Sequence, residues 1–366
     1  MSRPWTLDRM VLPVSAFPAV HQPGTWIDVT PSGLPMARNA YGNNDNFGIQ
    51  DVLVDPLNPN ILLAFTCYNG VWRSTTYGTK GSWVKWSTEG GNLDFGKNWC
   101  AEWASDGSYI VCASGNNTSG SPQNNLVTHR STDGGKTWTK SAVLGSDPSH
   151  EPYSLTICHD DVNHVLAANK GAGTIWESTD GAQTWGSPIT TGTGAGGDYV
   201  KFLLDTDTCL VVPQDTGTAR YGTRSGGTWS FADKGGNVHP HGGLELYIDH
   251  GNSLIYWPGI NGIQKSTDNG ATFSTLYNPS GDDQAVMAAT ATTIYSAFGF
   301  PTGDGTNDPK LRHALKASDT AWTEDSTPAA MTQGPKRIAV TNEGANYYLI
   351  AGCWNGGLLR YYEVPA

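Results

Sequence analysis

The sequence predicts an all-β fold, and within that class a single seven-bladed β-propeller of four-stranded blades. First, the 366 residues include 45 Gly, 21 Pro, 14 Trp and 15 Tyr, and only 15% are charged. Second, short apolar runs alternate with clusters of Gly, Asn, Asp and Ser, which is typical of strands joined by tight turns. Third, one short phrase recurs at the spacing of a propeller blade.

The phrase follows the pattern S-x-D-x-[GA]-x-T-[WF] and occurs as RSTDGGKTW, ESTDGAQTW and KSTDNGATF. The copies begin at Ser131, Ser178 and Ser266, so the gaps are 47 and 88 residues, or one and about two blades. Degenerate copies are expected in STTYGTKGSW (74–83), TRSGGTWS (223–230) and ASDTAW (317–322).

Turn formation is sufficient to explain the phrase, so no catalytic or binding role is needed for it. Asp and Ser side chains can accept hydrogen bonds from the N–H groups of a tight turn, and Gly adopts positive φ there. We therefore expect a structural role for Ser131, Asp133, Gly135, Trp138, Ser178, Asp180, Trp185, Ser266, Asp268 and Gly270.

Two strand-like runs precede each of the six copies or echoes, and a seventh pair, RIAVTNEGANYYLIAG and GLLRYY, follows them, which gives seven units within one domain spanning 1–366. The blades are expected roughly at 45–90, 95–145, 150–192, 196–236, 240–279, 283–328 and 334–366. The seventh unit lacks an outer strand. The run TWIDVT within 25–33 can supply it and close the ring, which removes exposed sheet edges, and 1–24 is then an N-terminal extension.

The net charge and the hydropathy of the sequence argue against nucleic acid and a membrane as partners. A net charge of -11 argues against nucleic acid, and no apolar run approaches the ~18–20 residues of a membrane span. We expect a monomer.

The N-terminus lacks a signal-peptide core, which leaves two locations open. We expect a secreted or extracellular protein whose leader has been removed, and a cytoplasmic location is the alternative. The six scattered Cys are interpreted as buried free thiols rather than disulfides.

A candidate site is expected at one end of the central channel. Aligning the units on the turn after each innermost strand brings one residue per blade to the axis: Phe47, Asn98, Pro152, Tyr199, His241, Asp282 and Gly334. Aromatic faces beside Asn, Asp and Lys suit sugar rings, although single loop Asp and Asn residues often only form turns. The expected substrate-binding residues are Asp45, Asn46, Tyr68, Asn98, His150, Lys201, Arg220, His239, Trp257, Lys336 and Trp354.

The repeat resembles the Asp-box, or BNR, element of β-propellers, which occurs in families with different functions. Residues 48–74, GIQDVLVDPLNPNILLAFTCYNGVWRS, resemble the opening blade of xyloglucanase-type glycoside hydrolases. The resemblance implies a propeller in which the repeated turn joins the outer strands. That family has a catalytic aspartate where this chain has Cys67, and it uses two tandem propellers. The resemblance therefore does not carry over catalytic residues. A sialidase is disfavoured because no Phe-Arg-Ile-Pro motif is present.

The preferred function is hydrolysis of a polysaccharide or oligosaccharide by two carboxylates, which lie ~5–5.5 Å apart for retention or ~6.5–9.5 Å apart for inversion. The candidates are Asp45, Glu151, Asp198, Asp282 and Asp283, with Glu151 and Asp198 preferred because they sit on neighbouring blades.

Two alternatives stay open. A polysaccharide lyase would use His241 or Tyr199 as base or acid, with Lys201, Lys336, Asn46 or Asn98 near the uronate carboxylate. The other alternative is a non-catalytic glycan-binding or scaffold propeller. The sequence requires no cofactor. A divalent cation is compatible with the His239-x-His241 pair, which lacks a third ligand nearby.

Overall fold

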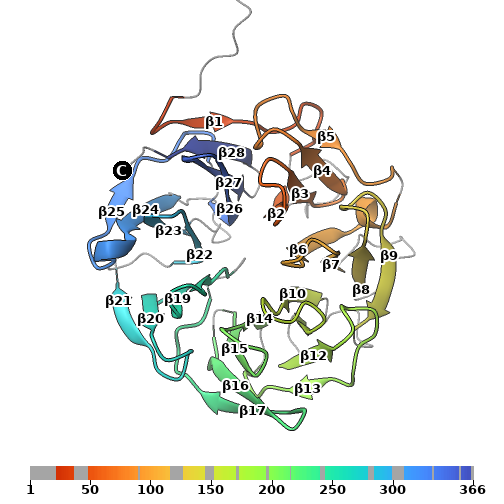
Figure 1. Cartoon of the computed structure of the whole chain (residues 1–366), viewed down its shortest axis with the longest axis vertical. Coiled ribbons are helices and arrows are strands. Elements are labelled where there is room, and N and C mark those ends of the chain that lie inside the picture. Colours follow the sequence, from red (N-terminus) through yellow and green to blue (C-terminus); the bar gives the residue numbers. More distant parts are fainter. Residues whose placement is uncertain are drawn as a thin grey trace, which may run out of the picture.

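The protein is described here from a computed structural model. It covers residues 22–36, 48–89, 91–115, 127–144, 152–169, 173–194, 198–214, 216–239, 244–278, 284–298, 309–331, 334–353 and 356–363. Within these ranges the chain forms seven four-stranded antiparallel sheets arranged in a ring, which confirms the seven-bladed propeller (Figure 1).

The first four blades follow one another along the chain, each with its innermost strand first. They are β2 (Ile49–Val54), β3 (Leu62–Thr66), β4 (Val71–Ser74) and β5 (Val84–Lys85); β6 (Lys97–Trp103), β7 (Ile110–Gly115), β8 (Val127–Ser131) and β9 (Thr139–Val143); β10 (Pro152–Ile157), β11 (Val165–Asn169), β12 (Thr174–Ser178) and β13 (Ile189–Thr190); β14 (Asp198–Phe202), β15 (Thr208–Pro213), β16 (Arg220–Ser225) and β17 (Thr228–Asp233).

The last three blades continue the ring in the same order. They are β18 (Tyr247–Asp249), β19 (Leu254–Gly259), β20 (Gly262–Ser266) and β21 (Ser274–Tyr277); β22 (Val286–Ala289), β23 (Thr293–Phe298), β24 (Lys310–Leu315) and β25 (Thr323–Asp325); β26 (Pro335–Glu343), β27 (Asn346–Cys353), β28 (Gly357–Tyr362) and β1 (Trp26–Asp28). In the described residues the helical elements are two 3₁₀ turns, η2 (Asn92–Phe95) and η3 (Lys316–Ser318), and no helix could cross a membrane.

The N-terminal strand closes the ring as the sequence predicts. β1 pairs antiparallel with β28 through Trp26 opposite Tyr361 and Asp28 opposite Leu359. Gly24 also donates a backbone hydrogen bond of 2.8 Å to the carbonyl of Tyr362. The last blade is therefore completed by the first strand of the chain, and the two lie side by side in Figure 1.

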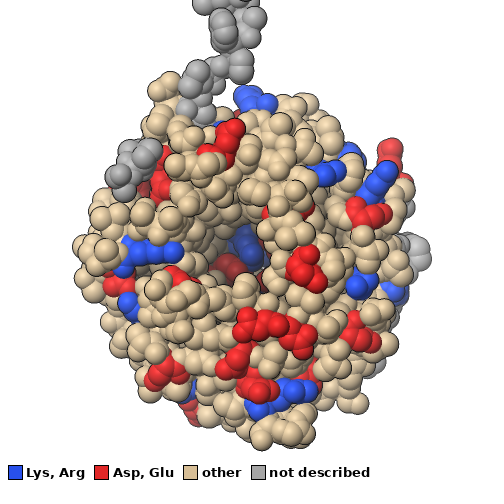
Figure 2. Space-filling model, viewed as in Figure 1, with Lys and Arg blue, Asp and Glu red and all other residues tan. Residues whose placement is uncertain are grey.

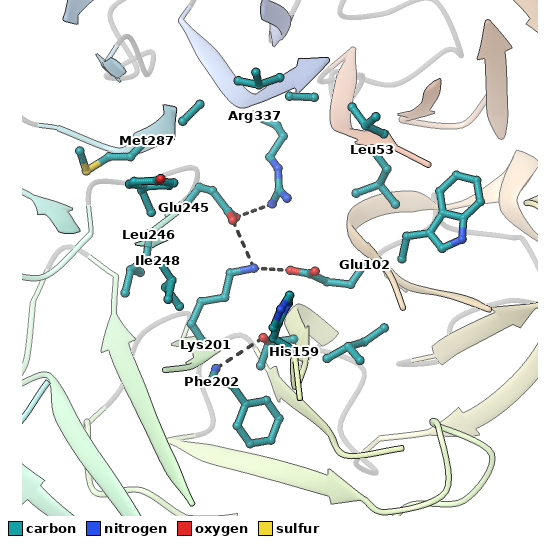
Figure 3. Close-up of a pocket in the computed structure, with 18 of the residues that line it drawn as sticks. Leu53, Glu102, His159, Lys201, Phe202, Glu245, Leu246, Ile248, Met287 and Arg337 are labelled. Carbon is teal, nitrogen blue, oxygen red and sulfur yellow. Dashed lines mark hydrogen bonds and ion pairs between the residues drawn. The ribbon is translucent and has the colours of Figure 1, made fainter. Parts of the chain in front are cut away.

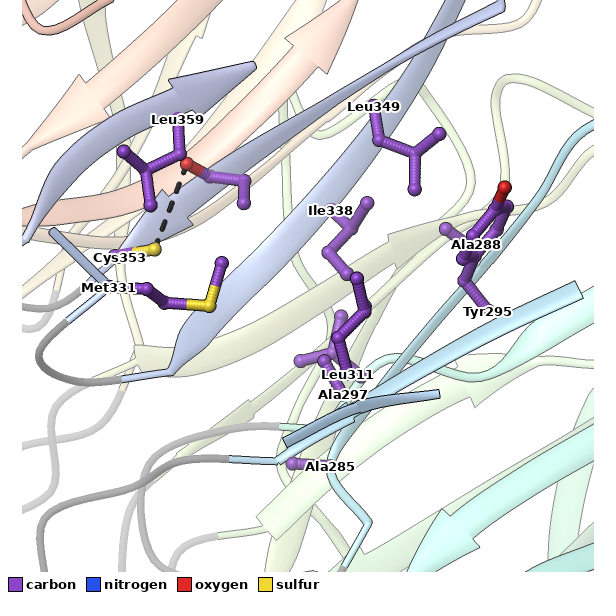
Figure 4. Close-up of a cluster of buried hydrophobic side chains, with 12 residues drawn as sticks. Ala285, Ala288, Tyr295, Ala297, Leu311, Met331, Ile338, Leu349, Cys353 and Leu359 are labelled. Atoms are coloured by element: carbon purple, nitrogen blue, oxygen red, sulfur yellow. Dashed lines mark hydrogen bonds between the residues drawn. The ribbon is translucent and has the colours of Figure 1, made fainter. Parts of the chain in front are cut away.

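The core lies between neighbouring blades. The second strands β3, β11 and β15 are buried along their whole length because a blade covers each face. Figure 4 shows one such layer, where Tyr295 and Leu311 of the sixth blade face Ile338 and Leu349 of the seventh. At Gly352 a Cβ would lie 2.7 Å from Ile49 of the first blade, so this close approach requires glycine.

The repeated phrase forms a hydrogen-bonded turn between the third and fourth strands of a blade. The Ser131 hydroxyl contacts Asp133 Oδ1 at 2.8 Å and accepts a bond from the N–H of Gly135. Asp133 accepts bonds from the N–H groups of Lys136 and Thr137 and from the Thr137 hydroxyl at 2.6 Å. These contacts hold the turn closed, and both glycines before Lys136 have positive φ.

The copy centred on Asp180 has the same bonds. The copy centred on Asp268 differs in one, because the N–H of Ala271 donates to the backbone carbonyl of Asp268 and not to its carboxylate. In the third blade Ala182 takes the place of Gly135, with a φ of 61°. Trp138 donates from its indole N–H to the carbonyl of Gly135 at 2.8 Å, so it anchors the same turn.

Of the three echoes, the one at Ser74 forms the same kind of turn. The Ser74 hydroxyl accepts a bond of 3.1 Å from the N–H of Gly78, as Ser131 does from Gly135. The echo at 223–230 is instead a tight hairpin in which Ser225 pairs with Thr228 across two glycines of positive φ. The echo at 317–322 overlaps the end of the 3₁₀ turn η3.

All six cysteines are free thiols, and five of them are buried.

Replacing Asp133 with alanine should destabilise the fold. Asp133 accepts several hydrogen bonds as a carboxylate, so we expect a loss of about 1–3 kcal/mol of unfolding free energy and a fall in Tm of about 1–4 °C. Thermal denaturation at pH 7 measures this. Glu89→Ala is a suitable control, because Glu89 is exposed and has no hydrogen bond in the described part of the chain.

The effect of Asp133→Ala should also depend on pH. Burial acts to raise the pKa of Asp133, but bonds from Thr137, Ser131 and Lys136 outweigh it and lower the pKa below 3.8. The stability that the carboxylate contributes is thus present above pH 3.8 and is lost as pH falls through the lowered pKa. The difference in Tm between wild type and Asp133→Ala should shrink on acidification, and a constant difference would contradict this account.

Candidate functional site

Four innermost strands carry a β-bulge at the same level, and the extra residues turn toward the axis. The register shifts leave Gln50, Trp99, Tyr153 and Lys336 unpaired in β2, β6, β10 and β26. Bulges re-aim side chains, and repeating one around a ring concentrates these side chains on the axis. All four are buried.

These bulge residues, together with Tyr199 of β14, form an axial cluster. The Lys336 ammonium donates to the carbonyl of Trp99 at 2.7 Å and to Gln50 Oε1 at 3.1 Å, and lies 4.6 Å from the centroid of the Trp99 ring. Trp99 packs edge-on to Tyr153, and Tyr153 to Tyr199, each with centroids 5.1 Å apart. The cluster fills the channel near the start of the innermost strands.

An axial ion network follows next to this cluster. It consists of Asp51, Glu102, Lys201, Glu245 and Arg337. Figure 3 shows the last four of these residues. The Lys201 ammonium contacts Glu102 and lies 3.2 Å from Glu245, while Arg337 contacts Glu245 and lies 3.6 Å from Asp51. Burial alone would lower the pKa of Lys201, but Glu102 and Glu245 outweigh it and raise the pKa to about 12. Lys201 therefore stays charged.

Asp51 connects the network to the backbone. Its two carboxylate oxygens accept bonds from the N–H of Val52 at 2.7 Å and of Ala101 at 2.8 Å, which ties β2 to β6. Burial raises the pKa of Asp51 to about 6, although Arg337 and the Ala101 N–H act to lower it. With both oxygens occupied, Asp51 is a structural carboxyl group.

A cavity of about 420 Å³ opens beyond the network, at the end of the channel where the innermost strands finish. Glu102, Lys201, Glu245 and Arg337 line its floor, with side-chain exposures of 13–19%. Trp103, Ser105, His159, Tyr247, His250 and Met287 are among the residues of its wall. Figure 2 shows the hollow at the centre of the ring, with acidic and basic side chains inside. A second cavity of only about 20 Å³ lies between the network and the axial cluster, enough for about one water.

Four of the expected site residues that the structure describes, Asn98, Tyr199, His239 and Lys336, are buried toward the other end of the channel. Asn98 donates to the carbonyls of Thr66 and Leu93, and His239 packs edge-on to Tyr199 with centroids 4.5 Å apart. Tyr199 and Lys336 belong to the axial cluster. Burial raises the pKa of Tyr199 well above its usual range, with Tyr153 adding to the effect, which does not suit a general base.

Three more expected substrate-binding residues, Trp257, Arg220 and Tyr68, do not line the cavity of about 420 Å³. Trp257 is within β19, fully buried against Phe273, so it packs in the core instead of facing a ligand. Arg220 lies on the third strand β16, where it pairs with Asp233 and donates to the carbonyl of Gly192. Tyr68 is 7% exposed and has a positive φ. Of the expected binding residues, Lys201 alone also lines the cavity of about 420 Å³ in the described part of the chain.

The remaining expected residues are not described. Asp198 begins β14, but its side chain lies outside the description. Those wholly outside the described residues are Asp45, Asn46, His150, Glu151, His241, Asp282, Asp283 and Trp354. The Glu151–Asp198 pair and the His239-x-His241 pair therefore stay predictions.

Asp51, Glu102, Glu245 and Arg337 are not among the site residues predicted from the sequence. These residues lie within or beside apolar strand-like runs, where a single charged residue usually marks the solvent face. The signal that could have found them is the alignment of inner strands by their bulges, but a bulge has no sequence signature in this chain.

Comparison with known proteins supports the fold and leaves the function open. No family model matches the chain, and no curated protein matches it. The solved structure of U3-55K is similar with a TM-score of 0.56 and 9% identity, covering 87% of this chain and 96% of that one. A functionally unknown protein from Desulfotomaculum acetoxidans DSM 771 has a TM-score of 0.53 and 9% identity, covering 74% and 83%. At such identity the likeness shows a propeller fold alone.

Removing the central cation should test the ion network. Lys201→Met leaves Glu102 without its cation and Glu245 with only Arg337, so we expect the free energy of unfolding to fall by about 3–5 kcal/mol at pH 7. Urea denaturation measures this. The penalty should become smaller at low pH, because protonation removes the uncompensated negative charge, and adding Glu102→Gln should restore part of the loss.

Lys310→Met is the matched control for Lys201→Met. Lys310 pairs at 3.1 Å with Glu324, whose side chain is 47% exposed, so its loss should cost less than about 1 kcal/mol. Equal losses for the two variants would show that the axial network contributes no more than a rim ion pair.

Proposed function

We propose that this protein is a carbohydrate-active enzyme that cleaves glycosidic bonds of a polysaccharide or oligosaccharide at the axis of the propeller, by hydrolysis. The observation that supports this is the axial cavity, whose floor holds two carboxylates, Glu102 and Glu245, on one ammonium group. Its volume of about 420 Å³ is in the range of small-ligand sites. Trp103 and Tyr247 add aromatic surface for sugar rings.

The two carboxylates have different surroundings, which suggests different roles. Hydrolysis needs one carboxyl group that donates a proton and one ionised carboxylate that acts as nucleophile or base. Glu245 contacts both Arg337 and Lys201, and two cations stabilise its negative charge. Glu102 contacts only Lys201 among the cations of the network, so a single cation offsets its charge. We assign Glu245 as nucleophile or base and Glu102 as acid.

Activity measurements on three variants test the assignment. Glu245→Gln and Glu102→Gln should each lower kcat by about 10²–10⁴-fold, measured as new reducing ends from a panel of neutral and uronate-containing polysaccharides. Glu151→Gln should keep wild-type turnover, because Glu151 belongs to the pair predicted at the opposite end. Loss of activity only in Glu151→Gln would overturn the assignment and move the site to Glu151 and Asp198.

Chemical rescue separates a catalytic role from a structural one. If Glu245 is the nucleophile, added azide should restore turnover to Glu245→Ala by substituting for the missing carboxylate. A variant that is inactive because the ion network has collapsed would not respond to azide, and its Tm would fall instead. Circular dichroism and thermal denaturation should accompany each kinetic measurement.

A polysaccharide lyase is the second candidate. The observation in its favour is that Lys201 and Arg337 both reach the cavity floor, where cations would neutralise a uronate carboxylate and make the adjacent proton more acidic. β-Elimination produces an unsaturated uronate that absorbs in the ultraviolet, together with a new reducing end. Reducing ends alone indicate hydrolysis, both signals indicate a lyase, and glycan binding without either product indicates a non-catalytic propeller.

A further inference from the structure

Two turns bring a pair of histidines and an aspartate together at the mouth of the axial cavity. His159 and Asp160 follow β10 of the third blade, and His250 follows β18 of the fifth blade. The two imidazole rings are stacked with centroids 4.1 Å apart and planes 24° apart. One ligating atom from each of the three residues lies within 4.8 Å of the other two.

Among the described residues, these three side chains take no part in the hydrogen bonding of the fold. The Ser105 hydroxyl donates to the backbone carbonyl of His159 at 3.1 Å, which fixes the turn and leaves the imidazole available. No hydrogen bond or ion pair to the described residues engages the side chains of His159, Asp160 and His250. By contrast, His164 pairs with Glu177 at 2.6 Å and His313 with Asp325 at 2.8 Å.

The arrangement is also specific within the described part of the molecule. No other group of three His, Cys, Asp or Glu residues there brings its ligating atoms this close together. The residues come from blades that are not neighbours and meet only because the turns converge on the axis. His159 and Asp160 are exposed and His250 is half-buried, so a solvated ion can reach them.

We propose that His159, Asp160 and His250 bind a divalent transition-metal ion of the Zn²⁺, Co²⁺ and Ni²⁺ group. Two imidazoles and one carboxylate suit these ions, whereas Mg²⁺ and Ca²⁺ prefer oxygen ligands alone. Bonds of ~2.0–2.2 Å in a tetrahedral site place ligand atoms ~3.3–3.5 Å apart. The three side chains lie in surface turns, and their rotation would bring the ligating atoms from within 4.8 Å of one another to this spacing.

Three protein ligands leave the ion an open coordination position. Both histidines line the axial cavity whose floor holds Glu102 and Lys201. An ion bound there would present its open position to a ligand in the cavity, where it favours an oxygen donor such as a hydroxyl or a carboxylate. Metal binding by these three residues does not depend on glycosidic cleavage. It can be measured directly, whether or not the cavity is catalytic.

Isothermal titration calorimetry of Zn²⁺ into the full chain tests the site. The protein should be free of affinity tag and freed of metal with EDTA, then dialysed. Wild type should bind one Zn²⁺ per chain. His159→Ala and His250→Ala should each weaken binding by about 100-fold or more, and Asp160→Asn by about tenfold. Co²⁺ and Ni²⁺ should compete with Zn²⁺, and Mg²⁺ should not.

His313→Ala is the matched control, because His313 is also a partly exposed histidine near a carboxylate, Asp325, but has no third ligand among the described residues. It should bind Zn²⁺ as wild type does. The proposal is overturned if wild type binds no more tightly than His250→Ala, or if His313→Ala weakens binding as much. If one variant fails to fold by circular dichroism, the other two decide the result.

Discussion

Closure of the ring is the constraint on which the rest of the structure depends. Each blade is a twisted four-stranded sheet that buries its faces only against the blades on either side, so an open ring would expose one blade face at each end. Pairing of β1 with β28 joins the two ends of the chain in one sheet. The close packing at Gly352 against Ile49 shows the same constraint where the seventh blade meets the first.

Closure determines what the axis can contain. Seven innermost strands converge there, and any charged side chain that points inward is removed from water at considerable cost. In this chain, contacts in two layers of side chains compensate for that cost. Lys336 is held by Trp99 and Gln50 among aromatic rings, and Lys201 and Arg337 are paired with Glu102, Glu245 and Asp51. The bulges that turn Gln50, Trp99, Tyr153 and Lys336 inward make the first layer possible.

The residues that stabilise the repeated turns and the candidate functional residues thus lie in different parts of the propeller. The repeated turns around Asp133, Asp180 and Asp268 join the outer strands, where they hold short hairpins closed. The charged cavity and the His159–Asp160–His250 group lie at the axis, where turns from different blades meet. A blade repeat can therefore stay regular at the rim while the axial residues differ from blade to blade, which is the arrangement that a single asymmetric site needs.

The sequence by itself determined the number of blades, the strand-turn pattern, the closing strand and the role of the Ser and Asp residues in the repeated turns. These features depend on local spacing and on side chains bonding to nearby backbone, and both can be read along the chain. Only the tertiary structure decided which charged residues meet. Glu102, Lys201, Glu245 and Arg337 are far apart in sequence and come together because their blades converge on the axis, and of the strands that carry them only β6 and β26 contain a bulge. Trp257 was expected to bind substrate, but the pairing of β19 with β20 continues past it to Gly259, and Trp257 is buried in the core. Register and burial are set by contacts between blades, and a single strand does not encode them.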